Sequence, residues 1–156
     1  MLDGFTKWDK RFLELAELIS SWSKDPSTKV GCVIVNDNRR ILATGYNGFP
    51  YGVKDTEERL TNRDLKYEIV VHSEANAVAH AAREGISLKG ATAYINYPPC
   101  CKCSSLLIQA GITRIVHAPR ELRADWKKSV DLGKEITSEA WSTHSLLTIE
   151  DFNRLK

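Results

Sequence analysis

Two short segments with potential metal ligands constrain the fold most strongly. The first is His72-Ser73-Glu74, and the second is Pro99-Cys100-Cys101-Lys102-Cys103. Each segment opens a stretch that is predicted to be helical. Cys100 and Cys103 are three residues apart, so both sulfurs lie on one side of a helix start. The fold must therefore bring two helix N-termini together if these side chains are to share one ion.

The three side chains of His72, Cys100 and Cys103 are candidate zinc ligands. A helix N-terminus favours negative charge, which helps to keep both thiolates ionised. Three protein ligands leave one tetrahedral position open, as a catalytic zinc ion requires. Glu74 lies two residues from His72, where its carboxylate can move protons to a ring nitrogen and to a leaving amine. A redox pair, or half of a structural zinc site, is the alternative for Cys-x-x-Cys.

The other two cysteines are not expected to bind the ion. Cys101 points about 100° of helix turn away from Cys100, so it is predicted to pack instead. Cys32 lies in an apolar strand and is predicted to be a core residue.

Charge and composition argue against several classes of protein. Lys plus Arg is 22 and Asp plus Glu is 20, which gives a net charge of +2 and no basic track for nucleic acid. No apolar core of a secretory signal occurs in residues 1–20, and no stretch is long enough to span a membrane. We therefore expect a cytoplasmic protein with reduced thiols and no membrane partner.

Hydrophobic periodicity predicts an α/β fold made of one domain over residues 1–156. A helix is expected first, then a hairpin, then alternating helices and strands, which implies a mixed sheet with helices on both faces. The expected ranges are helix 7–23, strands 30–35 and 41–46, helix 72–83, strand 91–96, helix 101–110, strand 113–117, helix 123–141 and strand 144–149. Residues 48–68 are predicted to be an insertion, which is either a solvated loop or a lid or subunit contact.

These motifs resemble the cytidine deaminase superfamily, and its deoxycytidylate (dCMP) deaminase branch most closely. The pattern His-x-Glu followed by Pro-Cys-x-x-Cys is the known signature of zinc nucleobase deaminases. Further similar segments are Ser23–Gly31, Gly45–Pro50, His72–Ala77 and Leu107–Ile112. The resemblance implies a three-layer sandwich with a mixed five-stranded sheet between helices.

The resemblance also implies an activity. Members of this branch deaminate dCMP to dUMP and ammonia, which supplies dUMP for thymidylate synthesis. It implies one Zn²⁺ per chain on His72, Cys100 and Cys103, with Glu74 as the proton shuttle. Asn47 is implied to contact the substrate nucleoside, and Ser73 to offer backbone groups to the base.

Assembly and regulation are further implications of the resemblance. Many members of the branch form hexamers, so a homo-oligomer is expected. Effector nucleotides, dCTP as activator and dTTP as inhibitor, are implied at a site that involves Tyr46, Asn47 and Gly48, with Mg²⁺ accompanying the nucleotide. Residues 48–68 hold neither Cys nor His, so a second zinc ion is not expected.

A 5′-phosphate on the substrate requires hydrogen-bond donors. Ser27 and Thr28 are candidates because their hydroxyls and backbone N–H groups precede the first strand. Arg120 or Arg123 is the candidate from the opposite side, and Lys24 and Lys29 are further candidates. Tyr97, before Pro98, is a candidate wall of the base site.

Other functions remain open at this point. The same zinc chemistry suits another free amino-pyrimidine or nucleotide, such as dCTP, cytidine or hydroxymethyl-dCMP. A tRNA- or DNA-editing deaminase is disfavoured because the helix expected over 123–141 balances its basic and acidic residues. A zinc-stabilised binding module is disfavoured by the open coordination position beside Glu74.

Overall fold

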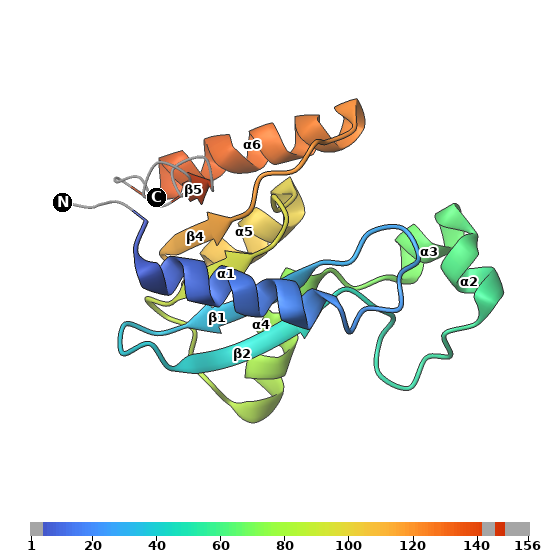
Figure 1. The fold of residues 1–156 in the computed structure, drawn as a ribbon, viewed down its shortest axis with the longest axis horizontal. Coiled ribbons are helices and arrows are strands. Elements are labelled where there is room, and N and C mark those ends of the chain that lie inside the picture. Colours follow the sequence, from blue (N-terminus) through green and yellow to red (C-terminus); the bar gives the residue numbers. More distant parts are fainter. Residues whose placement is uncertain (1–4, 142–145, 149–156) are drawn as a thin grey trace.

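The centre of the fold is a mixed sheet with the strand order β2-β1-β3-β4-β5 (Figure 1). The computed structural model describes residues 5–141 and 146–148. The antiparallel hairpin β1–β2 pairs through β1 with β3, and β3, β4 and β5 run parallel. The elements are α1 (Lys7–Ser20), β1 (Gly31–Val35), β2 (Ile41–Tyr46), α2 (Glu57–Thr61), α3 (Arg63–Ile69), α4 (Ser73–Glu84), β3 (Thr92–Ile95), α5 (Cys101–Gln109), β4 (Arg114–His117), α6 (Ala124–Ala140) and β5 (Leu146–Thr148).

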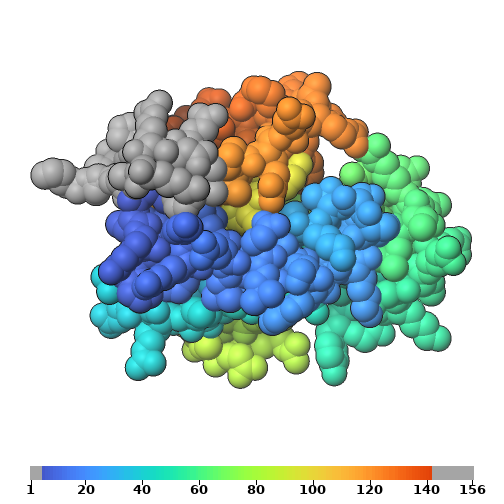
Figure 2. All heavy atoms as spheres, in the orientation of Figure 1, coloured from blue at the N-terminus to red at the C-terminus, as the bar shows by residue number. Residues whose placement is uncertain are grey.

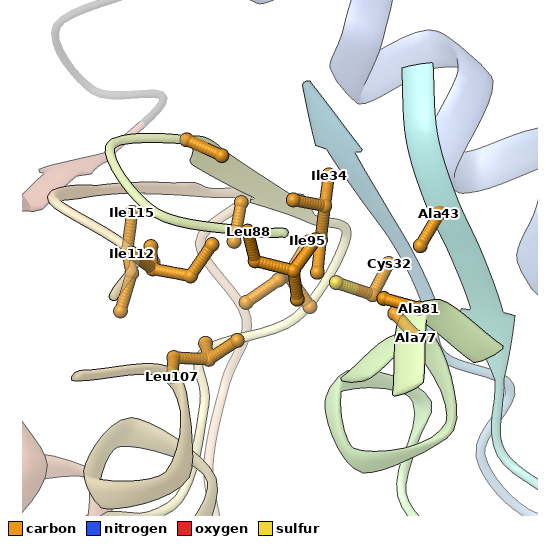
Figure 3. Close-up of a cluster of buried hydrophobic side chains, with 12 residues drawn as sticks. Cys32, Ile34, Ala43, Ala77, Ala81, Leu88, Ile95, Leu107, Ile112 and Ile115 are labelled. Carbon is orange, nitrogen blue, oxygen red and sulfur yellow. The ribbon is translucent and has the colours of Figure 1, made fainter. Parts of the chain in front are cut away.

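Helices cover the sheet on both faces, as the sequence predicts. Successive residues of β1 point to opposite faces. Val33 and Val35 pack with Phe12 of α1, whereas Cys32 and Ile34 join the core beneath α4 and α5 (Figure 3). Every residue of β1 is buried, which explains why this strand is almost wholly apolar.

An ion pair holds α1 against the parallel strands. Asp9 is buried, and its carboxylate accepts hydrogen bonds from Arg114 Nη1 at 2.7 Å and from the Tyr94 hydroxyl at 2.8 Å. Thr6 caps the same helix, because its hydroxyl accepts from the Asp9 backbone N–H while Asp9 accepts from the Thr6 N–H. The buried carboxylate is therefore fully compensated.

Residues 48–71 leave the sheet after β2 and return to it before α4. The two ends of this segment meet in a bridge, in which Gly48 and Val71 exchange both backbone hydrogen bonds. Between them, α2 and α3 lie at one end of the molecule, beside the loop that follows α1 (Figure 2). The segment expected as an insertion thus contains two short helices and not only a solvated loop.

Most expected elements are present, with differences at their ends. The first helix ends at Ser20 and not at residue 23, and Ser21 to Ser23 form turns instead. The last strand is shorter than expected: β5 covers 146–148, and the remaining residues of the expected range 144–149 lie outside the described residues. In the part of the chain that the structure describes, no helix combines the length and apolar character needed to cross a membrane.

Candidate metal centre and nucleotide cavity

Three potential ligands converge where α4 and α5 begin. His72 is the N-cap residue of α4, Cys100 is the N-cap residue of α5, and Cys103 lies in the first turn of α5. The His72 Nδ1 atom lies 3.7 Å from Cys100 Sγ and 3.4 Å from Cys103 Sγ. Within residues 5–141 and 146–148, this is the one group of three His, Cys, Asp or Glu side chains that could hold a metal ion.

The spacing of these three atoms fits a tetrahedral zinc ion. Typical bonds of about 2.0–2.1 Å to nitrogen and about 2.3 Å to sulfur place neighbouring nitrogen and sulfur ligands about 3.5 Å apart. The distances from His72 Nδ1 to the two sulfurs lie on either side of that value. Two soft sulfurs and one imidazole nitrogen also form a donor set that zinc prefers. Cys101 is not part of the group, as the sequence predicts.

The two cysteines differ in acidity because they share hydrogen bonds. Donation from Cys103 and from His72 lowers the pKa of the Cys100 thiol to about 4. The hydrogen bond to Cys100, together with burial, raises the pKa of Cys103 above its ordinary value. The hydrogen bond to Cys100 also raises the pKa of His72. Metal binding to this set therefore has to release protons.

Glu74 lies in the first turn of α4 and is almost fully buried, with 4% of its surface exposed. Burial raises the pKa of its carboxyl group, because a low-dielectric environment disfavours the charged form. The Ser73 hydroxyl donates to Glu74 Oε2 at 3.0 Å. Ser73 is thus fully buried beside the carboxylate, and its side chain contacts the proposed proton shuttle.

A cavity of about 800 Å³ opens in front of these residues. His72, Ser73 and Glu74 are among the residues that line it. Tyr97 and Trp126 form an aromatic wall, with the Trp126 ring 5.8 Å from the His72 ring and 6.4 Å from the Tyr97 ring. The volume lies within the range of small-molecule sites, about 300–1,000 Å³.

Asn47, Ser27 and Thr28, the expected substrate contacts, all line this cavity. The Asn47 side chain also holds the loop in front of β1: its Oδ1 accepts from the Val30 N–H at 2.8 Å, and its Nδ2 donates to the Thr28 carbonyl at 2.9 Å. A contact to substrate would therefore use the remaining Nδ2 hydrogen or unused oxygen lone pair.

The expected phosphate donors already have partners within the chain. The backbone N–H groups of Ser27 and Thr28 donate to Asp25 Oδ1, at 2.8 and 3.1 Å, so their hydroxyls are the donors that remain for a phosphate. Arg120 is not among the cavity-lining residues, and its Nη2 donates to Glu17 of α1 at 3.1 Å. Arg123 does line the cavity, but its guanidinium is paired with Asp125.

Two residues of the expected effector site lie away from the cavity. Tyr46 is partly exposed, and its ring packs edge-on against Trp22 at 6.2 Å. Gly48 forms the bridge to Val71. Neither residue is among those that line the cavity.

Sequence reasoning missed the residues that α3 contributes. Arg63, Lys66 and Tyr67 all line the cavity. Lys66 is buried and donates to Asp25 Oδ1, across 41 positions of sequence. In the sequence, the only local sign that these three residues share one side of a helix is their spacing of three and four positions. The same spacing in a highly charged segment suits a solvated helix equally well.

Comparisons with known proteins agree with this geometry. The family model for the cytidine and deoxycytidylate deaminase zinc-binding region matches residues 6–118. An uncharacterised deaminase of Aliivibrio fischeri is 38% identical over 138 residues, covering 86% of this chain and 90% of that protein. The deoxycytidylate deaminase of Mus musculus is 37% identical over 122 residues, covering 73% of this chain and 66% of its own.

A solved structure of similar fold is the dCMP deaminase of the cyanophage S-TIM5 in complex with dCMP and dUMP. It is 25% identical to this chain and has a TM-score of 0.71, covering 92% of this chain and 96% of its own. The similarity therefore extends over almost the whole of both chains.

Proposed function

This chain belongs to the family of cytidine and deoxycytidylate deaminases, and we propose that it hydrolyses dCMP to dUMP and ammonia with one zinc ion. The observation that carries the proposal is the convergence of the His72, Cys100 and Cys103 ligand atoms, together with a cavity that both His72 and Glu74 line. A relative named deoxycytidylate deaminase at 37% identity and the fold of a dCMP-bound enzyme support this choice of substrate.

His72, Cys100 and Cys103 would hold the zinc ion. When bound in such a site, zinc lowers the pKa of water to about 7, so that hydroxide is available as a nucleophile near neutral pH. Glu74 takes the proton that the attacking water gives up and passes it to N3 of the cytosine ring. It then takes the proton of the hydroxyl group added at C4 and passes it to the amine, as the C4–N bond breaks and the carbonyl forms. The raised pKa of Glu74 suits a group that must both take up and release a proton.

The cavity walls orient the base and exclude water from it. Tyr97 and Trp126 offer an aromatic surface to the pyrimidine ring. Asn47 fixes the loop in front of β1 and offers its remaining polar capacity to the sugar. The chemistry requires the reacting carbon near the metal centre, and a cavity that both His72 and Glu74 line supports a base bound beside them.

The wider role follows from this activity. The product dUMP would supply thymidylate synthesis in the cytoplasm. A homo-oligomer, with a hexamer as the expected form, is supported by exposed apolar side chains on α1, in the turn after it and on β2, namely Leu18, Trp22 and Ile41. Regulation by dCTP and dTTP is part of the same proposal.

A substrate screen on zinc-loaded protein tests the proposal. Ammonia release is measured with dCMP, CMP, dCTP, deoxycytidine, cytosine and 5-hydroxymethyl-dCMP. We expect turnover of dCMP with clear preference over deoxycytidine and cytosine. Turnover of another compound in this set but not of dCMP would replace the substrate and keep the zinc chemistry. No turnover of any of them would contradict the proposed function.

A further inference from the structure

Lys66 is a buried cation in the wall of the cavity. Its side chain is only 8% exposed, and its Nζ lies 3.2 Å from Asp25 Oδ1 and 3.3 Å from Ser27 Oγ. A lysine ammonium group carries three N–H donors, so these two contacts leave one donor for another partner. Lysine is rarely buried unless its charge has a partner.

The carboxylate of Asp25 balances the positive charge of Lys66, so it does not also neutralise a second cation. Its Oδ1 already accepts from the backbone N–H groups of Ser27 and Thr28 as well as from Lys66. The pair of Asp25 and Lys66 is therefore close to neutral and well satisfied. Its effect on the fold is to hold α3 against the loop in front of β1.

Arg63 adds a positive charge at the same end of the cavity. It lies three residues before Lys66, on the same side of α3, and both line the cavity. The Arg63 guanidinium lies 5.2 Å from the centre of the Tyr67 ring, and no ion pair with a carboxylate is found for it among the described residues. Arg63 thus brings to the cavity a positive charge that no ion pair with a described acidic side chain neutralises.

The carboxylate of Glu74 and the cations of α3 belong to one cavity. Glu74, Arg63 and Lys66 all line it. Val70 and Val71 connect α3 directly to His72, so one stretch of backbone positions both groups of side chains. A ligand with its ring amine at Glu74 and an anionic group at α3 would match both.

We infer that Arg63 and Lys66 bind the 5′-phosphate of the substrate, so that the 48–71 segment makes the enzyme select nucleotides over nucleosides. This inference rests on the proposed deaminase function and specifies how its substrate is recognised. Lys66 donates its remaining N–H to a phosphate oxygen, and Arg63 supplies a planar guanidinium. The Ser27 hydroxyl, fixed by Lys66, lies beside them.

Two variants test this inference, and a third is the matched control. Arg63→Gln and Lys66→Met each remove one proposed phosphate contact. Arg59→Gln removes a cation from the same segment, but Arg59 does not line the cavity and its Nη1 donates to the Lys54 carbonyl. The readout is the ratio of kcat/KM for dCMP to kcat/KM for deoxycytidine.

We expect the ratio to fall about 10- to 100-fold in Arg63→Gln and in Lys66→Met, the size of one lost hydrogen bond to a charged group. The ratio in Arg59→Gln should equal that of the wild type. An unchanged ratio in Arg63→Gln overturns the inference, whether kcat/KM stays the same for both substrates or falls equally for both. Arg63 is exposed, so this variant decides the matter even if Lys66→Met fails to fold.

Binding measurements separate this inference from the proposed function. Calorimetry compares dUMP with deoxyuridine in wild type and in Arg63→Gln, and this comparison does not depend on turnover. A preference for dUMP that weakens in Arg63→Gln supports the inference even if the reaction differs from the one proposed. If the variant changes only the response to added dCTP, the residues serve an effector phosphate and the inference is wrong.

Discussion

Glu74 shows at the residue scale how burial and chemistry are linked. A carboxylate that is 4% exposed would normally be avoided, because its desolvation is not fully repaid by hydrogen bonds. Ser73 provides one hydrogen bond at 3.0 Å, and burial still raises the pKa of Glu74. A group of this kind contributes little to stability, which favours a role in proton transfer.

Glu74→Gln is expected to lower kcat for dCMP by about 10²–10⁴-fold, because the amide cannot move protons but keeps the shape of the side chain. Zinc content should stay at one ion per chain, since His72, Cys100 and Cys103 are unchanged. Turnover by ammonia release and metal content by elemental analysis check both parts. Glu84→Gln, exposed near the end of the same helix, is the matched control and should retain full activity. Normal turnover in Glu74→Gln would remove Glu74 from the mechanism.

At the scale of the elements, the packing of α4 against β2 sets the position of the site. Gly45 of β2 faces the start of α4 so closely that a Cβ atom there would overlap the Ser73 carbonyl oxygen and lie 2.5 Å from the Ala77 backbone nitrogen. The absent side chain lets the helix lie directly on the strand. His72 and Glu74 are thereby held at a fixed height above the sheet.

Gly45→Ala is expected to displace the start of α4 and destabilise the fold by about 1–3 kcal/mol, the cost typical of overpacking. Because His72 moves with the helix, zinc affinity should fall at the same time. Gly48→Ala is the matched control, since a Cβ atom at Gly48 meets nothing within 4 Å. Thermal unfolding and competition with a zinc chelator measure the two effects. Equal zinc affinity in the two variants would mean that the contact does not position the metal centre.

The elements also show which parts of the site were predictable. The metal ligands could be found from sequence because each sits at a helix start whose local pattern is clear, at His72 and at Cys100. The surroundings of Arg120 were harder to predict, because the segment between β4 and α6 has no regular pattern and its partner Glu17 lies on a helix that is distant in sequence. The position of Lys66 beside the cavity depends on its ion pair with Asp25, a residue 41 positions away, and no local sequence pattern predicts such a pair.

At the scale of the whole molecule, the metal centre lies between elements that the core already holds together. One core cluster lies between α1 and the sheet, and the other lies between the sheet and the helices α4 and α5. β3 lies at the centre of the strand order, with β1 and β4 beside it, and the apolar sequences of these strands fit a buried position. The alternation of elements predicted the mixed sheet but not this order. Neither cluster contains a proposed metal ligand, so zinc is expected to add stability to a fold that the two cores already support.

Removal of zinc is therefore expected to lower Tm without unfolding the protein at room temperature. A ligand that binds only the native state stabilises it by about 2.7 kcal/mol at a concentration 100 times Kd, and about 1 kcal/mol shifts Tm by roughly 2–4 °C in a domain of this size. Scanning calorimetry with and without chelator measures the shift, and His72→Ala is the control whose Tm should not respond to chelator. An unfolded apo-protein at 25 °C would show that the two cores alone do not sustain the fold. An unchanged Tm after complete loss of zinc would show that the ion does not link α4 to α5 in the native state.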